Sequence, residues 1–396
     1  MSLDWKTVEL KSIANVTMGQ SPKSKFYNDN SEGMPFLQGN KTFGDKYPSF
    51  ELYTTSIKKV AEKNSVLMSV RAPVGDLNIA QEDICIGRGV CGLKMKKGDN
   101  EFLYYLLKAN ISHLINKESG TVFGSINKND IETFEVTLPE DYEDQIKILT
   151  ILKNIDKKIE VCKNLNKNLE EQIETIYNSF FVYYDDYSQE ELEECEIGLI
   201  PKEWKLLSLG EVTTQIKEKV GDKDYKVFSA VNTGNLILSE EYFDKQVFSK
   251  SIEKYIVVKQ KEFAYNPARI NIGSIGRNDF DYDGCVSPVY VAFKVEEEYE
   301  NFMNMFIQSD RFKQWVITLA SGSVRQTLNY ADFSIIKLAY PPIDLIKKFN
   351  NIYDNYYEVI NYNKSVIHNL EKIRDILLPK LMSGEIDVSK INCDLE

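Results

Sequence analysis

Several loops of this sequence combine basic and amide side chains with glycine or proline, a composition that suits contacts to nucleic acid. Lysine and arginine on loops contact phosphates, whereas arginine, asparagine, glutamine and lysine can hydrogen-bond the edges of bases. Arg71 and Arg269 occupy roughly matching places in the two halves of the chain, which indicates a shared role in clamping a backbone. The candidate contact residues are Lys23, Lys25, Asn40, Lys41, Arg71 and Lys128 in the first half and Asn232, Asn235, Arg269, Asn271, Arg277, Arg325 and Gln326 in the second.

The patterns of the common catalytic and metal sites are missing from the sequence. Six cysteines form no C-x-x-C pair and there are two histidines, so we expect no zinc site, and thiols that are reduced packing residues. His113 and His368 both fall in sequence that predicts helix, where packing or surface roles are expected. No G-x-x-x-x-G-K-[ST] loop occurs, and no segment completes the Asn/Asp-Pro-Pro-aromatic loop of an adenine methyltransferase. We therefore expect no catalytic residue, metal or cofactor on this chain.

The two halves of the chain repeat each other. Trp5-Lys6 recurs 199 residues later as Trp204-Lys205, and the block 119–131 recurs as 321–333. Each block follows a helix-like stretch, Glu101 to Ile115 or Tyr299 to Leu319, and precedes a strand-like run that ends in Pro139 or Pro341. Repetition of both order and spacing indicates a duplicated module.

Within the repeated block the two copies differ at one informative place. Phe123-Gly124 in the first copy stands where the second has Arg325-Gln326. Arginine and glutamine can read guanine and adenine edges with paired hydrogen bonds. Two unlike half-sites would need one scaffold that carries different side chains. Replacing Arg325 with alanine is expected to relax the sequence specificity for one half-site. Neutral drift in a loop is the alternative.

A long segment with apolar residues three and four apart follows each module, which predicts coiled-coil helices. One polar residue interrupts each stripe, Asn166 in the first and Asn363 in the second, and in an antiparallel pair the two could bond to each other. The alternative is that the stripe drifts and each asparagine faces solvent. The predicted spacer contacts are Ile155, Ile159, Asn166, Leu169, Ile173, Tyr356, Val359, Asn363, Leu370 and Ile373.

The predicted fold class is α+β, with two similar globular domains joined by two long antiparallel coiled-coil helices. The strand-like runs include Ser65 to Arg71, Ile84 to Lys94, Tyr255 to Tyr265 and Val286 to Val295. The expected parts are a first domain (1–140), a spacer helix (141–183), a solvated acidic linker (184–199), a second domain (200–342), a spacer helix (343–378) ended by Pro379, and a C-terminal tail (379–396).

The net charge of −12 is unevenly distributed along the 396 residues. Residues 141–199 hold 6 basic and 15 acidic side chains, so most of the deficit lies there and both globular domains are close to neutral. Because phosphate attraction is local, each domain can still carry a basic face. A helix of ~40 residues would be ~60 Å long, comparable with one to two turns of duplex. Double-stranded DNA is therefore a natural target for two modules at a fixed spacing.

Two phrases resemble the specificity subunit of type I restriction-modification systems: Ile197-Gly198-Leu199-Ile200-Pro201-Lys202-Glu203-Trp204, and Leu377-Leu378-Pro379-Lys380-Leu381-Met382-Ser383-Gly384-Glu385-Ile386. The order of parts is similar along nearly the whole chain. The resemblance implies two target recognition domains, each reading one half of a split DNA sequence. It also implies a non-catalytic subunit that recruits two adenine methyltransferase subunits, which bind S-adenosylmethionine, and, in the complete system, ATP-dependent restriction subunits. The acidity of 141–199 leaves open whether that face meets a protein partner or water.

Two other classes of function remain open on the sequence. One is an enzyme that modifies DNA by itself, and the other is a coiled-coil tether whose two modules bind proteins. No apolar run reaches the ~18–20 residues that span a bilayer, and no signal region precedes Asp4. A cytoplasmic location without membrane contact is therefore expected.

Overall fold

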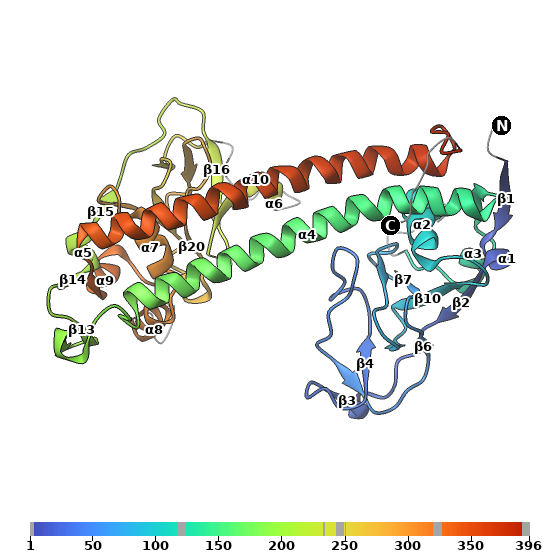
Figure 1. Cartoon of the computed structure of the whole chain (residues 1–396), viewed down its shortest axis with the longest axis horizontal. Coiled ribbons are helices and arrows are strands. Elements are labelled where there is room, and N and C mark those ends of the chain that lie inside the picture. The colour runs from blue at the N-terminus through green and yellow to red at the C-terminus, as the bar shows by residue number, and fades with distance from the viewer. Residues whose placement is uncertain are drawn as a thin grey trace. The chain divides into compact units, whose positions relative to one another are not determined.

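The computed structural model describes residues 4–116, 124–232, 234–242, 249, 251–319 and 327–389 (Figure 1). The chain divides into two compact units: unit 1 consists of residues 1–163 and 364–396, and unit 2 consists of residues 164–363. Each unit contains one module of mixed helix and sheet together with part of each of two long helices. The predicted α+β class with two similar modules is confirmed.

Unit 1 is built from three small sheets. β1 (Trp5–Glu9) pairs with β11 (Glu135–Pro139). A four-stranded antiparallel sheet has the order β2 (Ala14–Met18), β10 (Val90–Met95), β7 (Val66–Ser69) and β8 (Leu77–Ile79). The third has the order β3 (Tyr27–Asn28), β5 (Tyr53–Thr54), β4 (Met34–Leu37), β9 (Ile84–Ile86) and β6 (Val60–Ala61). The helical segments of this module are α1 (Leu10–Ile13), η1 (Ser24–Phe26), α2 (Asn100–Asn116) and α3 (Lys128–Glu132).

Unit 2 repeats this arrangement. β14 (Lys205–Ser208) pairs with β23 (Lys337–Tyr340). One four-stranded sheet has the order β15 (Thr213–Ile216), β22 (Val291–Val295), β19 (Phe263–Tyr265) and β20 (Ile275–Arg277), and the other β17 (Leu236–Leu238), β16 (Lys226–Ala230), β21 (Gly284–Val286) and β18 (Ile256–Val258). The helical segments are α5 (Leu209–Val212), α6 (Ser239–Tyr242), η3 (Ile270–Ile272), α7 (Glu300–Phe306), α8 (Asp310–Leu319) and α9 (Tyr330–Ser334).

The central strand pairings of the two modules correspond. Cys85 of β9 lies between a parallel β4 and an antiparallel β6, and Cys285 of β21 lies between a parallel β16 and an antiparallel β18. Parallel neighbours need a crossover connection, so this shared mixed pairing is a specific feature of the fold. The duplicated sequence therefore folds into duplicated topology.

One stretch predicted as a single helix, Tyr299 to Leu319, is two helices. α7 ends at Phe306 and α8 begins at Asp310. The Ser309 hydroxyl accepts a hydrogen bond from the backbone N–H of Phe312 at 3.2 Å, which caps α8. A cap of this kind favours a new helix start over a continuous helix.

The long helices α4 (Tyr142–Phe181) and α10 (Ile343–Met382) pack against each other within each unit (Figure 1). In both units, residues farther along α4 contact residues that come earlier in α10. The predicted antiparallel pairing is therefore confirmed. The contacts are Asp156 with Arg374 and Lys163 with Glu371 in unit 1, and Asn166 with Asn363 and Tyr177 with Phe349 in unit 2.

The apolar seam of α10 is displaced by one residue from the prediction. Val359 and Ile373 are 42% and 46% exposed, so their assignment to the spacer contact was wrong, whereas Tyr353 and Ile360 are buried. Val359 and Ile360 are adjacent apolar residues, and Ile360 faces α4 because it lies one helical turn before the buried Asn363. The other predicted spacer residues, Ile155, Ile159, Asn166, Leu169, Ile173, Tyr356, Asn363 and Leu370, are buried or half-buried.

Pro379 does not end the second long helix, contrary to prediction. α10 continues through it to Met382, and Gly384 then adopts a left-handed φ of +78°. The proline removes one backbone hydrogen bond, but Leu381 and Met382 are buried in the core of unit 1, which stabilises the last turn.

The acidic stretch after α4 is more ordered than the solvated connection predicted for it. It contains η2 (Gln189–Glu191) and a two-stranded pairing of β12 (Leu192–Cys195) with β13 (Gly198–Pro201). Leu192, Cys195 and Ile197 pack against the core of unit 2, so this segment is part of that unit.

The fold also shows where the histidines and cysteines lie and whether any helix could span a membrane. His113 and His368 lie exposed on α2 and α10. Cys85, Cys91, Cys162 and Cys285 are buried free thiols, whereas Cys393 lies outside the described residues. No described helix is both long and apolar enough to cross a bilayer.

Candidate nucleic-acid interfaces

Four loops of unit 1 meet at one end of its sheets. The backbone N–H of Gly87 donates to Leu37 at 2.8 Å, that of Gly89 donates to Gln38 at 3.1 Å, and that of Val70 donates to Gly89 at 2.9 Å. The N–H of Gln20 reaches Ile86 at 2.8 Å. These bonds join the loops that carry five polar residues, which we call edge 1: Gln20, Gln38, Asn40, Arg71 and Arg88.

The repeated block of unit 1 joins this same edge. Arg71 forms a β-bridge with Ser125, and the N–H of Ile126 donates to Val70 at 3.1 Å. Lys128 follows at the start of α3, where it pairs with Glu132 at 3.3 Å. The structure therefore brings three predicted contact residues, Asn40, Arg71 and Lys128, to neighbouring loops.

The remaining predicted residues of unit 1 are exposed lysines beside the edge. Lys23 and Lys25 follow Ser21, whose hydroxyl accepts a hydrogen bond from the backbone of Arg88 at 3.2 Å. Lys41 pairs with Glu51 at 2.9 Å, with both side chains largely in water. Surface pairs of this kind are weak, so Lys41 can exchange its partner for a phosphate.

Unit 2 has a corresponding set of loops, which we call edge 2: Asn232, Asn235, Arg269 and Asn271. The Ser274 hydroxyl donates to the carbonyl of Ala230 at 2.6 Å, which ties the loop after β19 to the end of β16. Gly273 has a left-handed φ of +86°, and a Cβ there would lie 2.9 Å from the Asn232 carbonyl oxygen. All four edge residues are exposed.

The repeated block of unit 2 also ends at its edge. The backbone N–H of Leu328 donates to Pro267 at 3.0 Å, as that of Ile126 does to Val70 in unit 1. Arg325 and Gln326 lie outside the described residues. The described end of the block nevertheless lies beside the loop of Arg269.

Arg277 is not a surface contact, contrary to prediction. Its side chain is 5% exposed, and its guanidinium donates to Asp279 at 2.5 Å, to Asn301 at 2.7 Å and to the Tyr353 hydroxyl at 3.2 Å. The predicted glycine-rich loop contains the buried strand β20, and this strand turns Arg277 toward α7 and α10. Its role is to hold the module of unit 2 against the long helix.

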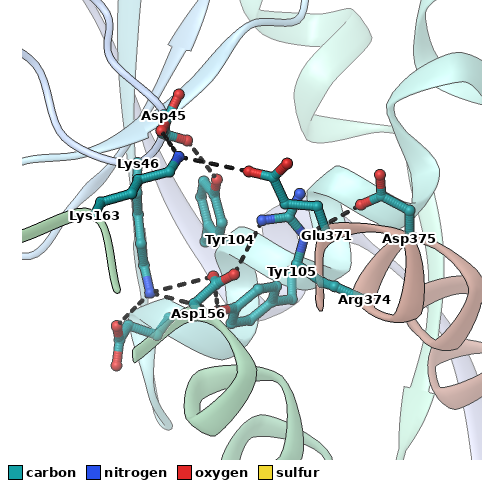
Figure 2. Close-up of polar contacts among 10 residues, drawn as sticks. Asp45, Lys46, Tyr104, Tyr105, Asp156, Lys163, Glu371, Arg374 and Asp375 are labelled. Carbon is teal, nitrogen blue, oxygen red and sulfur yellow. Dashed lines mark hydrogen bonds and ion pairs between the residues drawn. The ribbon is translucent and has the colours of Figure 1, made fainter. Parts of the chain in front are cut away.

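Unit 1 is held to its helices by a polar cluster, shown in Figure 2. Lys46 pairs with Glu101 of α2 at 3.1 Å and with Asp156 of α4 at 3.7 Å, and Arg374 of α10 reaches the same Asp156 at 3.0 Å. The Tyr105 hydroxyl also donates to Asp156. The Asp156 carboxylate is 13% exposed, and these three partners, Lys46, Arg374 and Tyr105, offset its desolvation.

The cluster extends to the loop that leads from edge 1. Lys163 of α4 pairs with Asp45 at 2.5 Å and with Glu371 at 3.5 Å. The hydrogen bond from Lys163 lowers the pKa of Asp45 below its usual value. Burial opposes ionisation of Glu101, but Lys153 and Lys46 outweigh it and lower the pKa of that carboxyl. The Asp45 and Glu101 carboxylates are therefore charged at neutral pH, and the pairs made by Asp45 and Lys46 hold this loop against α2 and α4.

The two central asparagines of the helix pair lie against each other in unit 2. The Asn363 side chain donates to the Asn166 oxygen at 2.8 Å, and Asn166 donates to the carbonyl of Ile360 at 3.3 Å. Both residues are buried. A single satisfied polar pair in an apolar seam favours one register of the helices.

Sequence reasoning missed Gln20, Gln38 and Arg88. Residues 84–94 were predicted as one continuous strand, whereas β9 ends at Ile86 and β10 begins at Val90. The signal was present, because an arginine between two glycines (Gly87-Arg88-Gly89) is typical of a turn. The described residues contain no cluster of acidic, cysteine or histidine side chains suited to a metal.

The described residues form two similar modules on paired helices, each with one edge of polar loop residues. Residues 2–171 match the family of the type I restriction modification DNA specificity domain. The putative type I restriction enzyme MjaX specificity subunit of Methanocaldococcus jannaschii is 43% identical over 182 residues, which cover 44% of this chain and 42% of that protein. The chain thus matches less than half the length of this relative.

Other similarities extend over nearly the whole chain. The type I restriction enzyme MjaIX specificity subunit of the same organism is 24% identical over 418 residues, covering 98% of this chain and 95% of that protein. A crystal structure of the S subunit of a type I restriction-modification system from M. genitalium has a TM-score of 0.58 at 16% identity and covers 96% of each chain, which bears on the fold. The first part of the chain thus matches the specificity-domain family, and nearly the whole chain is similar to type I restriction-modification specificity subunits.

Proposed function

We propose that this chain is the sequence-specific DNA-binding subunit of a type I restriction-modification complex, in which each unit reads one half of a bipartite site. The observation that carries the proposal is the pair of edges. Equivalent loops on equivalent sheets present glutamine and arginine in unit 1 and asparagine and arginine in unit 2. These side chains have the donors and acceptors that distinguish base pairs in the major groove.

The long helices are proposed to set the gap between the half-sites. They join the two modules, and each module is fixed to them by buried polar contacts, through Asp156 in unit 1 and Arg277 in unit 2. A module that could turn freely on its helix would not hold a defined spacing. Stiff attachment makes the second contact intramolecular and raises the affinity for correctly spaced sites.

Catalysis is assigned to partner subunits. We infer that two adenine methyltransferase subunits, which bind S-adenosylmethionine, dock on this chain. In the complete system, ATP is bound and used by the restriction subunits. A chain with net charge −12 repels DNA at long range, so partners that close round the duplex would supply part of the positive surface.

Sequencing of methylated bases in the host, with and without this chain, tests the function. We expect one motif with two short half-sites and a fixed gap, present only with the chain. A salt titration of duplex binding by the assembled complex should give log K falling linearly with log salt. Methylation that is independent of the chain, or a motif without a gap, would contradict the proposal.

The spacer role has its own test. Inserting seven residues into α4 after Lys163 and seven into α10 after Asn363 preserves the heptad seam. We expect a longer gap with both half-sites unchanged, read from the methylation motif. A change in the half-site sequences would show that the helices take part in reading bases.

A further inference from the structure

The loop Gly87-Arg88-Gly89 of edge 1 is held rigidly by its neighbours. Besides the bonds to Leu37 and Gln38, the N–H of Val90 donates to the Gly87 carbonyl at 3.0 Å, which closes the turn. A Cβ on Gly89 would lie 2.6 Å from the Gln38 carbonyl oxygen, and one on Gly19 would lie 2.1 Å from that of Gly87. Only glycine allows these approaches, so the path of the loop is fixed.

The Arg88 side chain projects from this fixed loop. It is exposed, and among the residues that the structure describes its guanidinium has no hydrogen-bond or ion-pair partner. Arg277 and Arg374, in contrast, are engaged in buried pairs. Because the backbone is already ordered, only the rotamers of the side chain lose freedom when Arg88 binds, and no contact within the described residues has to be broken, which favours a specific contact.

The duplicated module provides a comparison for this position. Pairings on both sides of the loop align Cys85 with Cys285 and Leu93 with Phe293, so the loop has the same length in both copies and Arg88 corresponds to Pro288. Pro288 has no donor, and Val289 beside it is 67% exposed. The loop has the same length in both copies, but the residue at its tip is arginine in unit 1 and proline in unit 2.

We propose that Arg88 reads a guanine, through its O6 and N7 atoms, in the half-site bound by unit 1. The planar guanidinium matches these two acceptors, and this pairing is the commonest specific contact in the major groove. Edge 2 offers an apolar loop at the equivalent place and cannot read guanine there. The inference rests on the proposed function and adds one residue and one base to it.

To test this, the Arg88→Ala variant is expressed in the host in place of the unaltered chain, and the methylated bases are sequenced. We expect the preference for guanine at one position of one half-site to fall roughly 10- to 100-fold, with the other half-site and the gap unchanged. Lys97→Ala is the matched control, because Lys97 is exposed and follows the opposite end of β10. Its motif should equal that of the unaltered chain.

Each outcome has a separate meaning. An unchanged motif with Arg88→Ala, or an equal loss of methylation at every site, would overturn the assignment of Arg88. The proposed function would still stand if the unaltered chain gave a bipartite motif. Absence of any chain-dependent motif would overturn the proposed function itself. A urea unfolding midpoint that Arg88→Ala leaves unchanged shows that the variant is folded, as expected for a side chain that contacts no partner in the described part of the chain.

Discussion

At the scale of single residues, the arginines of unit 2 separate into packing and contact roles. Arg269 is exposed on edge 2, whereas Arg277, eight residues later, is buried between β20, α7 and α10. Both follow glycine- or proline-containing loops in the sequence. Only the second has carboxylate, amide and hydroxyl groups placed around its guanidinium, and this set of partners decides its role.

Replacing Arg277 with alanine is expected to destabilise unit 2. The change removes the donor to the Asn301 oxygen and one of two donors to the Tyr353 hydroxyl, which keeps its bond from Asn304. The cost is about 3 kcal/mol, at the low end for a broken buried pair because Asp279 is 42% exposed. Urea unfolding measures the loss. Arg269→Ala is the control, with an expected change below about 0.5 kcal/mol. Similar losses for both variants would contradict the bracing role of Arg277.

At the scale of elements, the long helices combine an apolar seam with one polar pair. Asn166 and Asn363 satisfy each other in the middle of the seam, with an additional bond to the carbonyl of Ile360. A helix pair with apolar residues alone could slide by a heptad. The asparagine pair makes such a shift unfavourable, because each amide would then be buried without its partner.

A double-mutant cycle should reveal this coupling. We expect Asn166→Leu and Asn363→Leu each to lower the free energy of unfolding by about 1–3 kcal/mol, since each leaves a buried amide unsatisfied. The double variant should be more stable than either single variant. Its methylation motif should include more than one gap, because register is no longer specified. Additive losses would mean that the two side chains do not interact.

At the scale of the whole molecule, unit 1 is assembled from both ends of the described chain. Leu378, Leu381 and Val388 are buried in the same core as the N-terminal module. Gly384 approaches Trp5 so closely that a Cβ would lie 2.6 Å from the indole nitrogen. In unit 2 the end of α4 plays the corresponding part, where Phe181 and Trp204 pack with ring centroids 6.0 Å apart.

Ending the chain after Met382 is therefore expected to weaken unit 1 alone. Loss of the fully buried Val388 should cost about 2 kcal/mol or more. Hydrogen exchange should rise in the sheets of unit 1 and stay unchanged in those of unit 2. Ile376→Ala, at a position 60% exposed on α10, provides a control without effect. Equal changes in both units would contradict the closure of unit 1 by the C-terminal segment.

The sequence by itself determined the duplication, the α+β class, the two long helices and their central asparagines. These features follow from local periodicity and from repetition, which are properties of the chain read in order. It also indicated loops with nucleic-acid chemistry, and Asn40, Arg71, Asn232 and Arg269 do lie on the two edges.

Only the tertiary structure decided the roles that depend on partners distant in sequence. It buried Arg277, moved the seam from Val359 to Ile360, carried α10 through Pro379 and divided residues 84–94 at Arg88. The physical reason is the same in each case. Burial and hydrogen-bond partners are supplied by segments tens to hundreds of residues away, and no local pattern specifies which of two adjacent residues will meet them.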